Sequence, residues 1–482
     1  MTKGLSRGVV SCLVAFLGLE CMAWAQKGPK EVFAFPPLNK IDLPEIHEVT
    51  LTNQMKVFLV EDRDFPTVDY KLMVRTGTLH DPADKVGLAA MTASVLRTSG
   101  SENMPGDLMD KKLEMIGGSL TCDANEYTVK VDMSLLREHA ELGLDLMANM
   151  LMHPAFDQNK IDLAKVQQRT AIARRNDEIY TLAIREFQKI IYGSQSPYAR
   201  HPEYATVSAI TRRDILDFFH RYFQPNNTQI TVRGDFDWKE MVALLEKELA
   251  GWTARPVHVP PDPKVNYRYD FSVSYVEKLD AVQSIILIGH IGGLMNDPDY
   301  PVMQVLSPIL SYERMFKKLS SEEGLYWAGG DYEFGYMHPG RFFVGATVKS
   351  ESTVKVVRKM LDELKRITEQ GVSDEELDLV RKFTLNGFVF EFDSKEQLVD
   401  RLALYKYFNF PKDFLETVMK KVEKVTKADV LRVARTHLHP DTVHILVVGN
   451  QAKFDAPLSV LGPVKTIDIT IPQGEPAERN TK

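Results

Sequence analysis

The sequence predicts an α+β protein built from two tandem homologous domains, each a mixed sheet covered by helices. Three observations lead to this fold class: a segment from the middle of the chain recurs near its end, strand patterns precede long amphipathic helices in each half, and a proline-rich stretch separates the halves. The 482 residues give room for two or three globular domains. Strands followed by runs of helices are typical of a layered α+β domain.

The repeat joins residues 210–236 to residues 425–451, without a gap and at a constant offset of 215 residues. Identical residues recur along its whole length: Thr211 and Thr426, Asp214 and Asp429, Leu216 and Leu431, Pro225 and Pro440, Ile230 and Ile445, Val232 and Val447, Gly234 and Gly449. So long an offset indicates a duplicated domain. Each copy predicts a helix capped by its threonine and ended by its proline, and then a strand.

Earlier in each half, residues 68–77 and 282–291 are strand candidates at nearly the same offset. The first alternates apolar with mostly polar residues, which predicts one buried and one polar sheet face, whereas the second is apolar on both faces. Amphipathic patterns predict long helices, for example over 162–175 and 375–386.

The domain boundaries follow from composition. The segment 253–264, TARPVHVPPDPK, has the composition of a linker. We therefore expect an N-terminal domain over 41–252, a C-terminal domain over 265–471 and a loose polar tail over 472–482.

The first 25 residues have the pattern of a cleavable signal peptide. Lys3 and Arg7 precede a short apolar run, and Ala23-Trp24-Ala25 supplies small residues at a cleavage-site spacing. The run is about half as long as the ~20 residues of a membrane-spanning helix. We expect an exported chain, periplasmic or extracellular and soluble after cleavage, in which Cys122 is the one remaining cysteine and no internal disulfide forms.

Charge argues against nucleic acid as a partner. The formal net charge is −7, from 59 basic and 66 acidic residues, which leaves no basic excess for a phosphate backbone or an anionic membrane. No other apolar stretch reaches the length of a membrane span.

Familiar catalytic motifs are missing. A zinc hydrolase of this kind needs two histidines at helical spacing with a glutamate nearby, yet none of the 12 histidines has another one four residues away. The sequence also lacks C-x-x-C, G-x-S-x-G, P-loop and G-x-G-x-x-G patterns.

Several segments nevertheless resemble the M16 peptidase family, the pitrilysin-like or inverted-zincin clan. The main one is DYKLMVRTGTLHDPADKVGLAAMTASVLRTSG at 69–100. Support comes from IGGSL at 116–120, HPAF at 153–156, YGSQSPYA at 192–199 and the duplicated ending. The resemblance covers nearly all of the chain after residue 25, and it implies the family's tandem homologous domains.

In active members of that family, a helix after G-L-A carries H-x-x-E-H, which supplies two zinc ligands and the general base. The matching positions here are Ala90, Ala93 and Ser94. The family's third ligand, a glutamate on a later helix, falls on Ala171, one helical turn before Arg174 and Arg175, whose positive charges we expect to repel zinc. The resemblance therefore implies a degenerate site with no catalytic residue and no bound metal.

The helical pattern agrees with this interpretation. Leu88, Met91 and Val95 form an apolar stripe, which places Ala90, Ala93 and Ser94 on an opposite face of small residues. Such a face either marks a vestigial metal site or only allows close helix packing.

The family's C-terminal domain also supplies an arginine and a tyrosine to substrate, and the match here is partial. Arg314 aligns with an upstream arginine, whereas the substrate-engaging pair falls on Ser320 and Trp327. We take Arg314, Tyr326 and Trp327 as candidate substrate-binding residues, with aromatic core packing as the alternative.

Two functions remain open. The first is a non-catalytic M16-type subunit that pairs with an HxxEH-bearing zinc subunit, or with itself, to form a chamber for extended peptides, zinc being expected only in the partner. The second is a zinc-free peptide-binding or assembly scaffold of the envelope. An autonomous hydrolase has little support, because no nucleophile lies beside a base.

Overall fold

The computed structural model describes residues 45–320, 327–390 and 395–473. The predicted signal peptide, the candidate Tyr326 and most of the predicted tail lie outside these ranges. None of the described helices is both long enough and apolar enough to cross a membrane.

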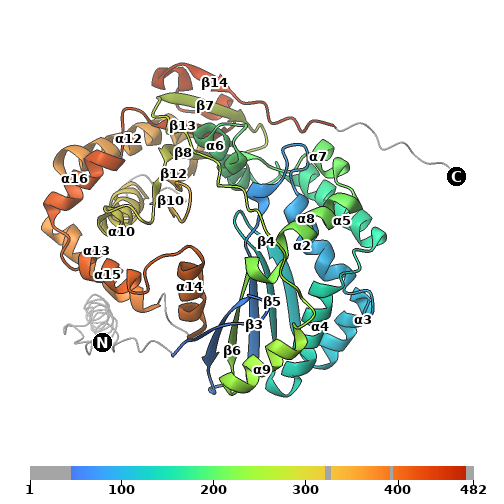
Figure 1. Cartoon of the computed structure of the whole chain (residues 1–482). Coiled ribbons are helices and arrows are strands. Elements are labelled where there is room, and N and C mark those ends of the chain that lie inside the picture. The colour runs from blue at the N-terminus through green and yellow to red at the C-terminus, as the bar shows by residue number, and fades with distance from the viewer. Residues whose placement is uncertain (1–44, 321–326, 391–394, 474–482) are drawn as a thin grey trace, which may run out of the picture. The chain divides into compact units, whose positions relative to one another are not determined.

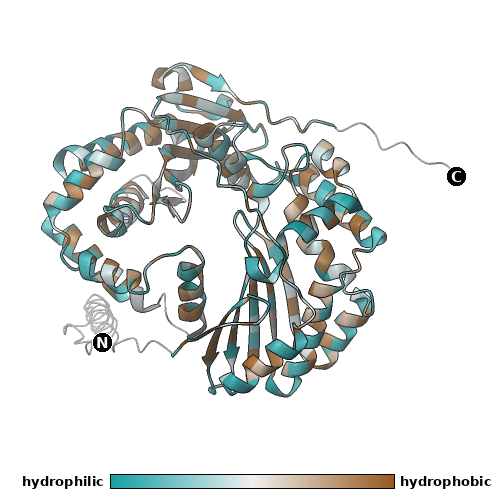
Figure 2. Ribbon diagram, viewed as in Figure 1, coloured by the Kyte–Doolittle hydropathy of each residue, from teal (hydrophilic) through white to brown (hydrophobic). Residues whose placement is uncertain are grey.

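The N-terminal half forms a six-stranded mixed sheet with the order β1-β2-β6-β3-β5-β4 (Figure 1). Its strands are β1 (His47–Thr50), β2 (Lys56–Glu61), β3 (Thr67–Val74), β4 (Ser119–Ala124), β5 (Val129–Leu136) and β6 (Thr228–Gly234). β2 and β6 run parallel, and β3 is antiparallel to both β6 and β5. Apolar and polar residues alternate along these strands (Figure 2), so one face enters the core and the other stays polar.

The C-terminal half forms a second six-stranded sheet with the order β10-β12-β8-β13-β7-β14. Its strands are β7 (Ser272–Glu277), β8 (Gln283–Ile291), β10 (Trp327–Tyr332), β12 (Arg341–Lys349), β13 (His444–Gly449) and β14 (Val464–Thr466). A two-stranded sheet pairs β9 (Gly293–Leu294) with β11 (Phe334–Gly335).

The two large sheets repeat one topology. The run β2-β6-β3-β5-β4 has the same order and chain sequence as β7-β13-β8-β12-β10. The predicted α+β class, with two mixed sheets covered by helices, is confirmed, although β4 and β5 follow two helices instead of preceding all of them. The sixth strands differ, because β1 is antiparallel to β2 and β14 is parallel to β7.

Helices of the N-terminal half cover one face of their own sheet, as Figure 1 shows for α2, α3, α4, α5 and α8. Their bounds are α2 (Leu88–Ser99), α3 (Gly106–Met115), α4 (Ala140–Met152), α5 (Gln158–Arg174), α6 (Ile179–Tyr192), α7 (Tyr204–Ala209), α8 (Arg212–Tyr222) and α9 (Trp238–Glu248). Short 3-10 turns are η1 (Thr78–His80), η2 (Arg137–His139), η3 (Pro197–Ala199) and η4 (Pro225–Asn227).

The C-terminal helices other than α14 cover one face of the second sheet in the same way. The helices of this half are α10 (Tyr300–Pro308), the π-helix η5 (Ile309–Ser320), α12 (Thr353–Gln370), α13 (Asp374–Phe390), α14 (Lys395–Tyr407), α15 (Phe414–Val422) and α16 (Lys427–His437), with 3-10 turns η6 (Ser350–Ser352), η7 (Gln451–Lys453) and η8 (Leu458–Leu461). The predicted threonine caps are present: Thr211 and Thr426 each form a capping box with the aspartate three residues on, at the starts of α8 and α16.

Each half lends one helix to the other half's sheet. α6 packs Leu182, Phe187 and Ile191 against the second face of the C-terminal sheet, in one cluster with residues such as Leu287 and Leu446. This explains why 282–291 is apolar on both faces. The helix at the position equivalent to α6 in the second half, 215 residues later, is α14. It packs against the polar face of the N-terminal sheet through a smaller cluster of Met73, Ala403 and Tyr407.

The predicted linker has no regular secondary structure, but it is packed. Val257 and Val259 lie against the N-terminal core, and the backbone carbonyl of Pro263 accepts a hydrogen bond of 2.8 Å from the Tyr198 hydroxyl. Ile471, at the end of the predicted C-terminal domain, also packs on the N-terminal core. The segments before and after the C-terminal sheet therefore help to join the halves.

Candidate functional site

The loop between β3 and α2 is fixed by the turn between β4 and β5. The backbone N–H groups of Thr78 and Leu79 donate to the carbonyls of Asn125 and Glu126, at 2.9 and 3.3 Å. Gly77 allows this approach, because a Cβ atom there would lie 2.3 Å from the Asn125 carbonyl oxygen. The loop that introduces α2 is thus joined to the sheet edge at β4.

Asp81 orients the start of α2. Its carboxylate oxygens accept hydrogen bonds of 2.8 Å from the backbone N–H groups of Gly87 and Ala89, and its side chain is buried. Burial raises the pKa of the Asp81 carboxyl to about 6, against the effect of these two donors and of Arg200. Gly87 precedes the helix with a φ of +106°, a conformation that favours glycine.

On α2, the predicted apolar stripe is confirmed, because Leu88, Met91 and Val95 are all buried. On the opposite face, Ala90 and Ser94 are partly exposed, whereas Ala93 is only 1% exposed. The burial of Ala93 agrees with the close-packing alternative at that position, because the helix packs against several neighbours, among them α5, α8 and β4.

α5 lies against α2, as the family's third-ligand helix should, and Ala171 on it is exposed beside the buried Ile172. We expected Arg174 and Arg175 to repel a cation there. Arg174 instead pairs with Asp177 at 3.2 Å, and Arg175 pairs with Glu203 at 2.8 Å. Because a carboxylate balances each of these positive charges, the two arginines give no reason to expect that a cation is repelled. The alanine side chain at position 171 offers no ligand in either case.

Within the described ranges, a single group of three His, Cys, Asp or Glu side chains lies close enough together for a metal ion: Asp297, Asp299 and His437. None of its members is on α2 or α5. Arg432 donates to both oxygens of Asp299, at 2.7 and 3.0 Å, and lowers the pKa of that carboxyl. Because a guanidinium already neutralises Asp299, this group forms an ion-pair network and is not suited to a metal.

Arg314 lies inside the C-terminal helical layer. Its Nη2 donates to Glu376 of α13 at 2.8 Å, and its Nη1 lies 3.5 Å from a carboxylate oxygen of Glu363 on α12. The side chain is 11% exposed. The guanidinium therefore joins η5 to two helices of its own domain and is not presented to a ligand.

Trp327 is the first residue of the edge strand β10 and is 37% exposed. Its ring lies edge-on to the ring of Tyr180 on α6, with centroids 6.2 Å apart. The predicted core packing holds for Tyr332, which is 5% exposed, but not for Trp327. Trp327 is therefore the one described member of the predicted set that lies at an accessible edge.

The free edges of the two sheets differ at β4 and β10. In an antiparallel pair, the backbone N–H and C=O groups of successive residues point alternately toward the partner strand and away from it. The N–H of Asn125 donates to the Thr128 carbonyl, so Asn125 points toward β5. Leu120, Cys122 and Ala124 therefore direct their backbone groups away from β5. Arg97 of α2 donates to the Leu120 carbonyl at 2.6 Å. No other hydrogen bond to these outward groups forms within the part of the chain that the structure describes.

At β10, two outward N–H groups are already occupied. Gly330 and Tyr332 donate to the hydroxyls of Ser311 and Ser307, each at 3.1 Å. A further strand could pair with the edge at β4 far more easily than with the edge at β10.

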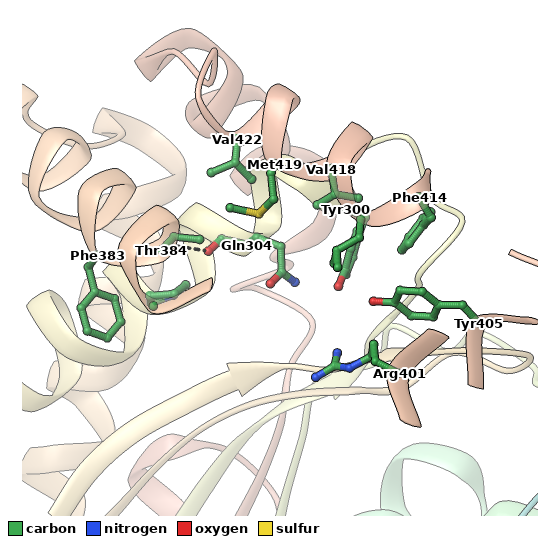
Figure 3. A pocket seen from close by; sticks show the side chains of 13 residues that line it. Tyr300, Gln304, Phe383, Thr384, Arg401, Tyr405, Phe414, Val418, Met419 and Val422 are labelled. Atoms are coloured by element: carbon green, nitrogen blue, oxygen red, sulfur yellow. Dashed lines mark hydrogen bonds between the residues drawn. The ribbon is translucent and has the colours of Figure 1, made fainter. Parts of the chain in front are cut away.

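Several cavities adjoin α14, and the sequence interpretation anticipated none of them. One, of about 330 Å³, lies among α10, α13, α14 and α15 (Figure 3). Its wall is largely apolar, and the polar ends of Tyr300, Gln304, Arg401 and Tyr405 point toward one part of it. Another, of about 360 Å³, lies between α14 and the polar face of the N-terminal sheet. The alternation of apolar and polar residues along 68–77 predicted a polar sheet face, and this second cavity lies on that face.

With this geometry in place, comparison with known families is informative. The profile "Insulinase (Peptidase family M16)" matches residues 56–196, and the profile "Peptidase M16 inactive domain" matches residues 209–383. The chain belongs to the M16 peptidase family.

Its relatives include both peptidases and a protein named as a non-peptidase. It is 20% identical over 412 residues to the non-peptidase homolog YmxG of Helicobacter pylori, covering 83% of this chain and 94% of that protein. It is 22% identical over 364 residues to an uncharacterized zinc protease of Streptomyces coelicolor, covering 73% and 76%. It is 19% identical over 421 residues to the mitochondrial-processing peptidase subunit alpha of Caenorhabditis elegans, covering 80% of each.

Solved structures share the fold. The peptidase M16 inactive domain from Pseudomonas fluorescens superposes with a TM-score of 0.75 at 20% identity, over 84% of this chain and 98% of that one. The periplasmic protease PqqL from Escherichia coli superposes with a TM-score of 0.72 at 17% identity, over 86% of this chain and 49% of PqqL.

Proposed function

We propose that this chain is a catalytically inactive M16-family subunit that pairs with an HxxEH-bearing zinc peptidase subunit and contributes a peptide-binding wall to a shared processing chamber in the cell envelope. One observation carries the proposal: the loop, cap and packing of α2 are intact, while Ala90, Ala93 and Ser94 stand where the family resemblance expects ligands and base. Side chains of alanine and serine offer zinc neither an imidazole nor a carboxylate.

The open edge at β4 supports the role in peptide binding. It lies next to α2 and offers main-chain donors and acceptors at Cys122 and Ala124. An extended peptide can pair with such an edge through its own main chain, with little demand on sequence. A chamber for varied peptides needs that tolerance.

A zinc-free scaffold is the second candidate, and the relative named as a non-peptidase homolog favours it. The two candidates differ in what the chain binds. Affinity purification of the tagged chain from its native envelope, followed by mass spectrometry and zinc analysis, should recover an HxxEH-bearing chain in equal amount, with zinc and peptidase activity. Recovery of unrelated proteins without zinc would establish the scaffold instead.

The edge at β4 has its own test. Cys122→Pro removes one outward N–H without touching the ladder to β5, so it should weaken binding of a fluorescent unstructured peptide about tenfold. Cys122→Val keeps the N–H and is the matched control. Equal binding by both variants would exclude β4 as the peptide edge.

Restoring the motif should fail. The triple variant Ala90→His, Ala93→Glu, Ser94→His places a carboxylate at a position that is 1% exposed, which should destabilise the fold by about 3 kcal/mol or more. The double variant Ala90→His, Ser94→His changes only the partly exposed positions and should fold, yet bind zinc weakly because Ala171 supplies no third ligand. Peptide cleavage by the triple variant would show that another residue serves as third ligand.

A further inference from the structure

The cavity between α14 and the N-terminal sheet is lined by polar groups of both signs. On the sheet these are Lys71, Lys130, Asp132 and Thr231, and α14 adds Asp400, among others. This is the face of the sheet that the N-terminal core does not use. The cavity, of about 360 Å³, falls within the usual range for small-molecule sites.

The strand register brings the polar groups together. In the strand register, Lys71 on β3 lies opposite Thr231 on β6 and opposite Asp132 on β5, so the three form one row across the sheet. Lys130 lies two residues from Asp132 on the same strand and therefore on the same face. Four side chains from three strands thus surround one space.

Lys71 does not pair with Asp132. Its ammonium lies 2.6 Å from Asp400 of α14, which leaves the Asp132 carboxylate without an ion pair among the described residues. Burial raises the pKa of the Asp132 carboxyl, against the effect of Lys71 and Lys130. Asp132 is therefore a partly desolvated acid that forms no ion pair with another described residue, although Lys71 and Lys130 lie near it.

Two more groups in the same cavity lack partners. Lys130 forms no hydrogen bond or ion pair with the described part of the chain. Thr231 is 3% exposed, and its hydroxyl is buried without a hydrogen-bond partner there. Leaving a buried hydroxyl unpaired is unfavourable, so a ligand or water that satisfies it is expected.

We propose that this cavity binds a short zwitterion of dipeptide length, whose ammonium pairs with Asp132 and whose carboxylate pairs with Lys130. Alternate residues on a strand stand about 7 Å apart. Two extended residues span at most about 7 Å, whereas the charges of a single amino acid are closer together. The spacing of Asp132 and Lys130 therefore matches the two ends of a dipeptide.

The cavity among α10, α13, α14 and α15 does not have this chemistry. Its wall is largely apolar, and none of its lining residues is a carboxylate (Figure 3). Binding at this site requires neither zinc nor a catalytic partner, so the proposal goes beyond the proposed function. Each of the two proposals can be tested without the other.

Isothermal titration calorimetry on the full chain tests the proposal with four probes: L-alanyl-L-alanine, its N-acetyl derivative, its C-terminal amide and L-alanine. The free dipeptide should bind at least about tenfold more tightly than each of the others. Asp132→Asn and Lys130→Gln should each weaken dipeptide binding about tenfold or more, and Asp132→Asn should no longer distinguish the free from the acetylated dipeptide.

Lys56→Gln is a matched control, because Lys56 lies exposed on the same sheet face outside the cavity lining. This variant should bind as the unaltered chain does. Folding is not expected to limit the test, since Asp132→Asn removes a charge that burial disfavours. No binding of the dipeptide at ~10 mM, or equal binding of all four probes, would overturn the proposal; equal binding of L-alanine would exclude the dipeptide length.

Discussion

Asp81 is a buried carboxylate that holds the first turn of α2 by accepting from two backbone N–H groups. Asp81→Asn leaves only one oxygen to accept, and turns an NH₂ group toward the other donor. We expect a loss of about 1–3 kcal/mol in the free energy of unfolding at pH 7, measured by urea denaturation. The exposed neighbour Asp84 is the control, and Asp84→Asn should change stability by less than about 0.5 kcal/mol. Equal effects of the two substitutions would mean that the cap does not stabilise α2.

The strand β10 shows how an edge is closed by two serines. Ser307→Ala combined with Ser311→Ala leaves the N–H groups of Gly330 and Tyr332 without acceptors at the sheet edge. We expect a loss of about 1 kcal/mol for each serine, and self-association through the exposed edge, seen as a concentration-dependent mass in light scattering. Ser459→Ala, at an exposed site away from any strand edge, should do neither. A monomeric double variant would show that the edge is protected by other means.

Acid should destabilise the molecule as a whole. Burial lowers the pKa of His338 to about 4 and that of His290 to about 3. Between these values and the usual ~6.5, the unfolded chain binds protons that the folded chain does not, so stability present at pH 7 is lost as the pH falls. At pH 5 each histidine should cost about 2 kcal/mol. Asp81 acts in the opposite direction, because its folded pKa of about 6 lies above the unfolded value.

Urea unfolding at pH 7 and pH 5 measures this balance, and His338→Asn should reduce the pH dependence by about one proton. Stability that stays constant or rises between pH 7 and pH 5 would contradict the expectation that the histidines dominate.

Local chemistry was predictable from the sequence, and contacts between distant segments were not. The capping boxes of Thr211 and Thr426 need only residues three apart, and the strand at 282–291 correctly signalled two covered faces. The sequence did not predict that α6 covers the second face of the C-terminal sheet, because the apolar residues of a helix do not indicate which element they pack against. The burial of Ala93 likewise depends on neighbouring elements and not on the pattern of α2.

The candidate site was also predictable only where it depends on local sequence. The positions that lack zinc ligands follow from a motif, whereas the polar cavity beside α14 depends on register between β3, β5 and β6 and on a helix more than 150 residues away in sequence. Arg314 illustrates the limit: its alignment suggested a ligand contact, but Glu363 and Glu376, from two other helices, surround it.

The exchange of α6 and α14 has a consequence for biosynthesis. The polar face of the N-terminal sheet receives its helix only after Tyr407 has left the ribosome, and α6 has no sheet to cover until β13, which ends at Gly449, has formed. Neither half can reach its final packing during translation of the first half, so the nascent chain stays incompletely folded until nearly all of it has been made. A chain that completes its fold this late remains accessible to chaperones for most of its synthesis.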